Sequence, residues 1–135
     1  MAAEEGVAAV EFALILPLLL VLVFGIVDYG YYFLLSMECT HAAREGARKG
    51  AVEPDVGSAV AAAETAAENY LTGVGLGSGA NAPDVAATTA VDEAFETELT
   101  VTVTLGDFEP LVGFLIPMPT AILASSSMHY EGVLP

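Results

Sequence analysis

The first third of the chain is apolar with few interruptions, and this pattern predicts a long helix. Between Phe12 and Leu35, 24 residues contain one charged side chain, Asp28. At about 1.5 Å per residue, a helix over this stretch would be about 36 Å long, which exceeds the roughly 30 Å of hydrocarbon in a bilayer. A membrane-spanning helix is therefore predicted. Glu45 and Lys49 follow at a favourable four-residue spacing, so we expect the helix to run from about residue 7 to about residue 49.

Two residues inside the apolar stretch disfavour a regular helix. Pro17 removes a backbone hydrogen bond and tends to kink or locally open the helix. Gly25 lies further along the same apolar stretch. A membrane helix tolerates such residues where neighbouring groups satisfy the freed backbone. Both positions are therefore candidates for helix packing. The aromatic residues within 29–33 form a band typical of the membrane–water boundary.

A second, shorter helix is predicted after the turn at residues 53–54. Its apolar positions recur at three- and four-residue steps, at Val56, Val60, Ala63, Ala67, Tyr70 and Leu71. This face is rich in alanine, so it can approach another helix closely. Gly73 is the expected C-cap, and residues 73–83 are expected to form a linker. The glycines of this linker lack the spacing and the following lysine of a phosphate-binding loop.

The last third of the chain changes to a two-residue period, which predicts strands. The clearest alternation with threonine involves Leu99, Val101, Val103 and Leu105. A weaker strand is expected at 85–91 and a third at 121–130. Residues 107–120 are interrupted by prolines and are expected to form a loop or a single helical turn that covers the sheet. The predicted fold class is α+β: a long N-terminal hydrophobic helix, a second shorter helix and a small antiparallel sheet of about three strands.

Composition narrows the class of function. The chain has 18 acidic residues against Arg44, Arg48 and Lys49, for a net charge of −15. Such a surface repels phosphate backbones, so no nucleic-acid partner is expected. One cysteine cannot form an internal disulfide. The apolar stretch is longer than the roughly 7–15 residues of a signal peptide and lacks both a basic start and a small-residue cleavage site, which favours a lasting membrane anchor.

Glu11 stands at the start of the apolar stretch, five residues after Gly6. A charged side chain at the centre of a membrane helix costs roughly 2.5–3.5 kcal/mol, although water can solvate a residue near the end of the helix. A function for Glu11 would require a cation. Cleavage after Gly6 would create one, the α-amino group of Val7, whose ordinary pKa is about 7.7–8. It could pair with Glu11 of its own chain or of a neighbour, and a buried pair of this kind sets register more reliably than it adds stability.

The order of these residues resembles that of type IV prepilins. Gly6 is followed by four small residues, then Glu11 and Phe12, then residues 13–18 with Pro17. More closely, the chain resembles the TadE-like pseudopilins, or minor pilins, of tight-adherence (Tad) pilus systems, which are type IVb-like. The further matching segments are residues 24–30, residues 42–48 and a C-terminal stretch from Val101 to Met128.

This resemblance implies a membrane protein with its N-terminus inside, cut between Gly6 and Val7 by a prepilin peptidase. Glu11 and Phe12 would then act in processing or in subunit registration. The implied segments are a leader (1–6), a membrane or filament-core helix (7–35), its extension (36–50) and a small type IV pilin-like α+β head (51–135). The implied location is the inner membrane, then the extracellular pilus or cell surface.

The implied function is that of a structural subunit that enters or primes an adhesive filament with other pilin or pseudopilin copies. Whether it is a minor or the main subunit stays open. Two features depart from the family: the leader carries Glu4 and Glu5 with no Lys or Arg, and by charge alone Arg44, Arg48 and Lys49 would place the C-terminal part in the cytoplasm. The alternative is an uncleaved single-pass envelope protein whose acidic head binds a partner or cations.

No catalytic or metal site is predicted, and no cofactor. Cys39, His41 and His129 provide too few ligands for a closed zinc site, and the acidic residues at 92, 93, 96 and 98 lack EF-hand spacing. No set of nucleophile, base and orienting residue emerges, so no enzyme is expected. Asp28 is expected either to be solvated beside the tyrosines or to pair with a neighbouring helix. Arg44 and Arg48 are expected on a solvated or sheet-facing surface, or as anchors of the acidic head.

Overall fold

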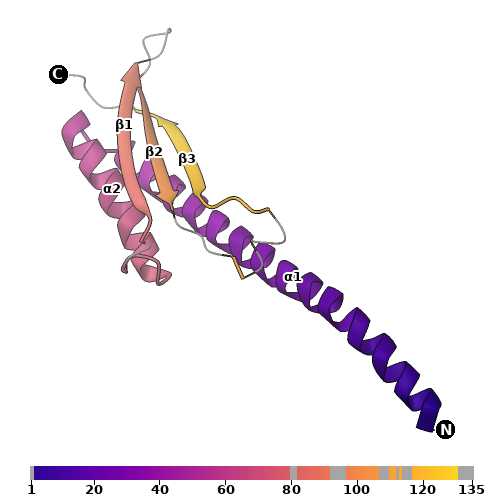
Figure 1. Ribbon diagram of the computed structural model, residues 1–135. Coiled ribbons are helices and arrows are strands. Elements are labelled where there is room, and N and C mark those ends of the chain that lie inside the picture. Colours follow the sequence, from indigo (N-terminus) through magenta and orange to yellow (C-terminus); the bar gives the residue numbers. More distant parts are fainter. Residues whose placement is uncertain are drawn as a thin grey trace. The chain divides into compact units, whose positions relative to one another are not determined.

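The computed structural model describes residues 2–79, 82–91, 97–106, 110, 111, 113 and 117–130. Its elements are α1 (Ala2–Gly50), α2 (Val56–Gly73), β1 (Asp84–Val91), β2 (Thr97–Leu105) and β3 (Ile122–His129) (Figure 1). The predicted fold class, α+β with a long and a short helix and three antiparallel strands, is confirmed.

α1 is one helix of 49 residues that begins at Ala2, before the predicted start at residue 7, and ends at Gly50. Pro17 lies inside it, and the helix continues on both sides of the proline. Arg48 and Lys49 occupy its last turn, where cations interact favourably with the negative end of the helix dipole. The predicted continuation of the helix beyond the apolar stretch is therefore confirmed.

The chain forms two compact units. The N-terminal unit comprises Met1–Phe33 with Glu109–Met118, and the globular unit comprises Leu34–Phe108 with Pro119–Pro135. Within the N-terminal unit, the hydroxyl of Tyr29 donates a 3.4 Å hydrogen bond to the carbonyl oxygen of Pro117. Half of residues 107–120 lie outside the described residues, so the covering of the sheet by this segment stays a prediction.

The ends of α2 are fixed by local hydrogen bonds. Asp55 is the N-cap, and its carboxylate accepts a 3.0 Å hydrogen bond from the backbone N–H of Ser58. At the other end the N–H of Gly75 bonds to the carbonyl of Thr72, and the N–H of Leu76 to that of Leu71, which is a Schellman motif. Gly75 has φ +83°. The C-cap is Val74, and Gly75 directly after it adopts the left-handed conformation, so the prediction of Gly73 as C-cap is wrong by one residue.

β2 lies at the centre of the sheet, with the order β1-β2-β3 and both pairings antiparallel. Its alternate residues from Thr97 to Leu105 are buried, while Thr100, Thr102 and Thr104 are half-buried on the other face. The register aligns Val103 with Ala124 and Leu105 with Ile122, which forms one continuous buried row. The three predicted strands are confirmed within one or two residues of their expected ends.

Small residues let α1 approach α2 and the sheet closely. Ala42, Ala43 and Ala47 of α1 are fully buried, as are Ala59, Ala63 and Ala67 of α2. A Cβ added at Gly46 would lie 2.7 Å from the carbonyl oxygen of Ala63, and one added at Gly50 would lie 2.6 Å from that of Ala59. Real Cβ atoms are not found so close to a backbone oxygen. The core of the globular unit therefore requires glycine at both positions.

Candidate functional site: an apolar helix and a basic groove

The apolar stretch of α1 exposes most of its side chains. The helix over Gly6–Gly50 is long and apolar enough to cross a membrane, and 6% of its most apolar part is buried within the described structure. Leu14 is 75% exposed and Leu18 is 72% exposed. An apolar surface of this extent marks a membrane or protein contact. The helix therefore needs lipid or other helices around it.

The residues predicted to act in processing and registration all lie on the exposed surface of α1. Val7 and Phe12 are 60% and 61% exposed, Glu11 is also exposed, and no atom lies within 4 Å of a Cβ added at Gly6. Val7 and Glu11 are four residues apart, so they are neighbours on one helix face. Among the residues that the structure describes, no cation lies within ion-pair distance of Glu11.

Gly25 and Asp28 are buried within the N-terminal unit. Asp28 is 4% exposed, so the expectation that it is solvated beside the tyrosines is not what the structure shows. The unit that contains Asp28 also includes Glu109–Met118. Gly25 and Tyr29 are also among the residues that line an apolar hollow of about 380 Å³ on α1. Pro17 is exposed.

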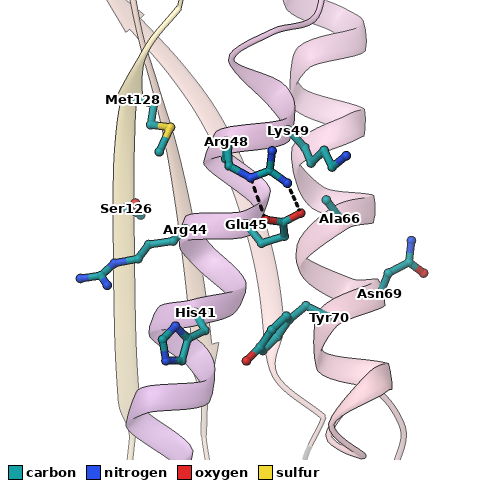
Figure 2. A pocket seen from close by; sticks show the side chains of 10 residues that line it. All are labelled: His41, Arg44, Glu45, Arg48, Lys49, Ala66, Asn69, Tyr70, Ser126 and Met128. Atoms are coloured by element: carbon teal, nitrogen blue, oxygen red, sulfur yellow. Dashed lines mark hydrogen bonds and ion pairs between the residues drawn. The ribbon is translucent and has the colours of Figure 1, made fainter.

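A groove in the globular unit brings together every arginine and lysine of the chain. This basic groove has a volume of about 860 Å³ and is bordered by α1, α2 and β3 (Figure 2). Its lining residues are His41, Arg44, Glu45, Arg48, Lys49, Ala66, Asn69, Tyr70, Ser126 and Met128. The expectation of a solvated surface holds for Arg44 and Arg48, since both are exposed.

Arg48 is held by Glu45 one turn earlier. Its Nε donates to one carboxylate oxygen at 2.9 Å and an Nη to the other at 2.7 Å, which is the bidentate geometry that suits a guanidinium. The hydrogen bond from Arg48 lowers the pKa of Glu45. Glu45 was expected to face Lys49 instead, and the structure replaces that pair because the planar guanidinium at the third position offers two donors.

Other polar contacts join the elements around the groove. The hydroxyl of Tyr70 on α2 donates a 2.8 Å hydrogen bond to Glu38 on α1, which raises the pKa of Tyr70, and the ring of His41 lies 6.3 Å from that of Tyr70. Glu64 accepts a 3.1 Å hydrogen bond from the backbone N–H of Ala87 in β1. Sequence reasoning missed these contacts because they join residues that are distant along the chain.

The cysteine and histidines do not come together as ligands. Cys39 is fully buried in the core, and burial raises the pKa of its thiol, whereas His41 is exposed in the basic groove. In the part of the chain that the structure describes, no group of three or more candidate ligands could hold a metal ion. Of the acidic residues weighed for calcium, Glu98 is exposed on β2 and the other three lie outside the described residues.

These observations define a class: a membrane-anchored α+β protein with one long apolar helix and a small acidic globular part. Residues 6–48 match the family model described as TadE-like protein, which confirms the resemblance predicted from the sequence. The matched segment runs from Gly6 past Glu11 to Arg48. No curated protein and no solved structure gives a significant match to the chain. The match associates the chain with tight-adherence pilus systems and with a structural role.

Proposed function

We propose that this chain is a pilin-like subunit of a tight-adherence pilus. It is inserted in the inner membrane through α1, processed after Gly6, and then assembled into a filament or used to prime one for adhesion. The observation that carries the proposal is the exposed apolar surface of α1 within the segment that matches the TadE-like family. Such a surface suits two environments in turn, since lipid and the helices of neighbouring copies are both apolar.

Processing after Gly6 would provide the cation that Glu11 lacks among the described residues. The new α-amino group of Val7 stands one helical turn before Glu11, at a spacing that allows an ion pair on one face. In a filament the same ammonium can reach Glu11 of a neighbouring copy. Its partners are thus a prepilin peptidase, the membrane and other pilin subunits, and the pair serves to set register between helices.

The first test is the mass and N-terminus of the chain recovered from its native membranes. We expect a chain that begins at Val7. Replacing Gly6→Leu should block cleavage, because a bulky residue would occupy the peptidase site, whereas Gly30→Ala on the same helix should not. Both glycines have nothing within 4 Å of an added Cβ, so the fold tolerates each change. A native chain that still begins upstream of Val7 would contradict the processing step.

Glu11→Ala separates assembly from insertion. The substitution removes a charge from an apolar helix, so membrane insertion should be retained or improved. Assembly should be lost, as measured by the recovery of sheared filaments against the membrane fraction. Phe12→Leu is the matched control, since it changes an exposed neighbour without changing charge. Normal filaments from Glu11→Ala would count against a role in registration.

The second candidate is an uncleaved single-pass envelope protein. Its specific support is that α1 runs without interruption from Ala2 through Gly6, and that Glu4 and Glu5 give this end no positive charge. Such a protein should keep its first residues and be indifferent to Glu11→Ala, so the two experiments above also decide between the candidates.

A further inference from the structure

Positive and negative side chains are distributed unequally between the basic groove and the rest of the chain. The groove collects Arg44, Arg48 and Lys49, which are all the Lys and Arg residues of the protein. Glu45 is the one acidic residue among its lining residues. The other 17 of the 18 acidic residues do not line the groove, and no Lys or Arg lies outside it. The groove is thus a local cationic surface on a chain whose net charge is −15.

Two of the three cations are available to a partner. Glu45 occupies two donors of Arg48, but among the described residues no carboxylate lies within ion-pair distance of Arg44 or Lys49. These two exposed side chains point to opposite sides of the Glu45–Arg48 pair (Figure 2). Asn69 adds an amide at the groove, and Met128 adds an apolar surface. The groove can therefore receive carboxylates together with part of a side chain or segment.

We propose that the basic groove docks the acidic surface of a second copy of this chain. The inference rests on the proposed function, because assembly through α1 brings acidic globular units close to one another. Exposed carboxylates in the described residues lie on the α2 cap, on α2 and on the first two strands, at Asp55, Glu68, Asp84 and Glu98. Two such surfaces repel each other, whereas an acidic surface against the groove is attracted. Charge complementarity of this kind selects the register of contact more than it adds affinity.

The contact joins two different surfaces, groove to acidic face, so it is heterologous. A heterologous contact that does not close into a ring continues from copy to copy and builds an open helical assembly. The groove would thus give direction to the contact between globular units, while α1 supplies the apolar association.

Lys49 is the single lysine of the chain, which permits a direct test. A water-soluble carbodiimide couples an ammonium to a carboxylate in contact with it, forming an amide and releasing the activator as its urea. We would treat the full chain in neutral detergent micelles, as a mixture of ¹⁴N- and ¹⁵N-labelled copies, and map the cross-linked peptides by mass spectrometry. The expected product joins Lys49 of one isotope to an Asp or Glu of the other.

Three variants make the test specific. Lys49→Arg keeps the charge but removes the amine, so the cross-link should vanish while association persists. Arg44→Gln with Lys49→Gln should weaken association by roughly two- to fivefold for each cation removed, since exposed ion pairs are weak. Lys49→Arg with Ala61→Lys moves the lysine to an exposed position on α2 and should cross-link between copies less than the native chain.

Contrary outcomes are equally definite. Cross-links confined to one copy, or equal yields from the relocated lysine, would overturn the proposal. So would a chain that does not cross-link in neutral micelles but binds anionic vesicles through Arg44 and Lys49, because the groove would then serve a lipid surface. If native filaments form but Lys49 is not cross-linked in them, the groove contact is contradicted and the proposed function is retained. If copies cross-link through Lys49 but the chain is never cleaved, the groove contact is retained and the processing step of the proposed function is contradicted.

Discussion

α1 approaches α2 closely at Gly46, and Gly46→Ala tests this contact directly. The added methyl would stand 2.7 Å from the carbonyl oxygen of Ala63, 3.2 Å from the Cβ of Ala67 and 3.3 Å from a methyl of Val101. The first of these atoms belongs to the backbone of α2, so no side chain can rotate away. α2 would have to move as a whole, or α1 would have to separate from it.

The expected net effect is a loss of stability. Overpacking of this kind costs about 1–3 kcal/mol, while replacing glycine by alanine inside a helix returns about 0.8–1.0 kcal/mol. With a backbone oxygen as the obstacle we expect the upper part of the range for the clash, which leaves a net destabilisation of about 1–2 kcal/mol. This corresponds to roughly a five- to thirtyfold larger unfolded fraction.

Hydrogen exchange of the β2 amides in the full chain, held in detergent micelles, measures this difference. Protection should fall by about the same factor as the unfolded fraction rises. Gly73→Ala is the matched control, because it lies in the last turn of α2 with no atom within 4 Å of an added Cβ. Unchanged or greater protection in Gly46→Ala would refute the close approach of α1 and α2 at this point.

Three further predictions concern local conformation and charge. Gly75→Ala should destabilise the end of α2 by about 1–2 kcal/mol, because a left-handed φ is costly for a residue with a Cβ, and faster exchange of the last α2 amides would report it. Asp55→Ala should destabilise α2, because it removes the N-cap carboxylate. Since hydrogen bonds from Ser58 lower the pKa of Asp55, the native chain should lose this stability as pH falls from about 4 through that lowered pKa. Urea unfolding of the variant should show a weaker acid dependence. Arg48→Gln should raise the pKa of Glu45 toward its ordinary value, as followed by carboxyl ¹³C NMR, and an unshifted titration would contradict the bidentate pair.

Periodic features of the sequence predicted most of the fold. The alternation in β2 and the uninterrupted apolar run in α1 each express burial or exposure along a single element, so a local pattern contains the information. The alanine-rich face of α2 likewise predicted a close helix contact. Its buried centre, Ala59, Ala63, Ala67 and Leu71, is rotated slightly from the expected face because the sheet shares in covering the helix.

Features that depend on distant residues could not be predicted in the same way. The close approach of Gly50 to the carbonyl of Ala59 depends on how α2 folds back onto α1. The sequence did carry one usable signal, small residues at 42, 46 and 50, four apart on one helix face. The burial of Asp28 had no such signal, because it arises within a unit that joins the start of the chain to residues 109–118.

Glu64 protects the β1 edge of the sheet against pairing with another strand. β1 is an edge strand, and an edge strand with free amides invites another strand to pair with it. The carboxylate of Glu64 occupies the amide of Ala87, so a strand that paired there would have to displace this hydrogen bond and bury a negative charge. This arrangement therefore disfavours β-aggregation through that edge of the sheet.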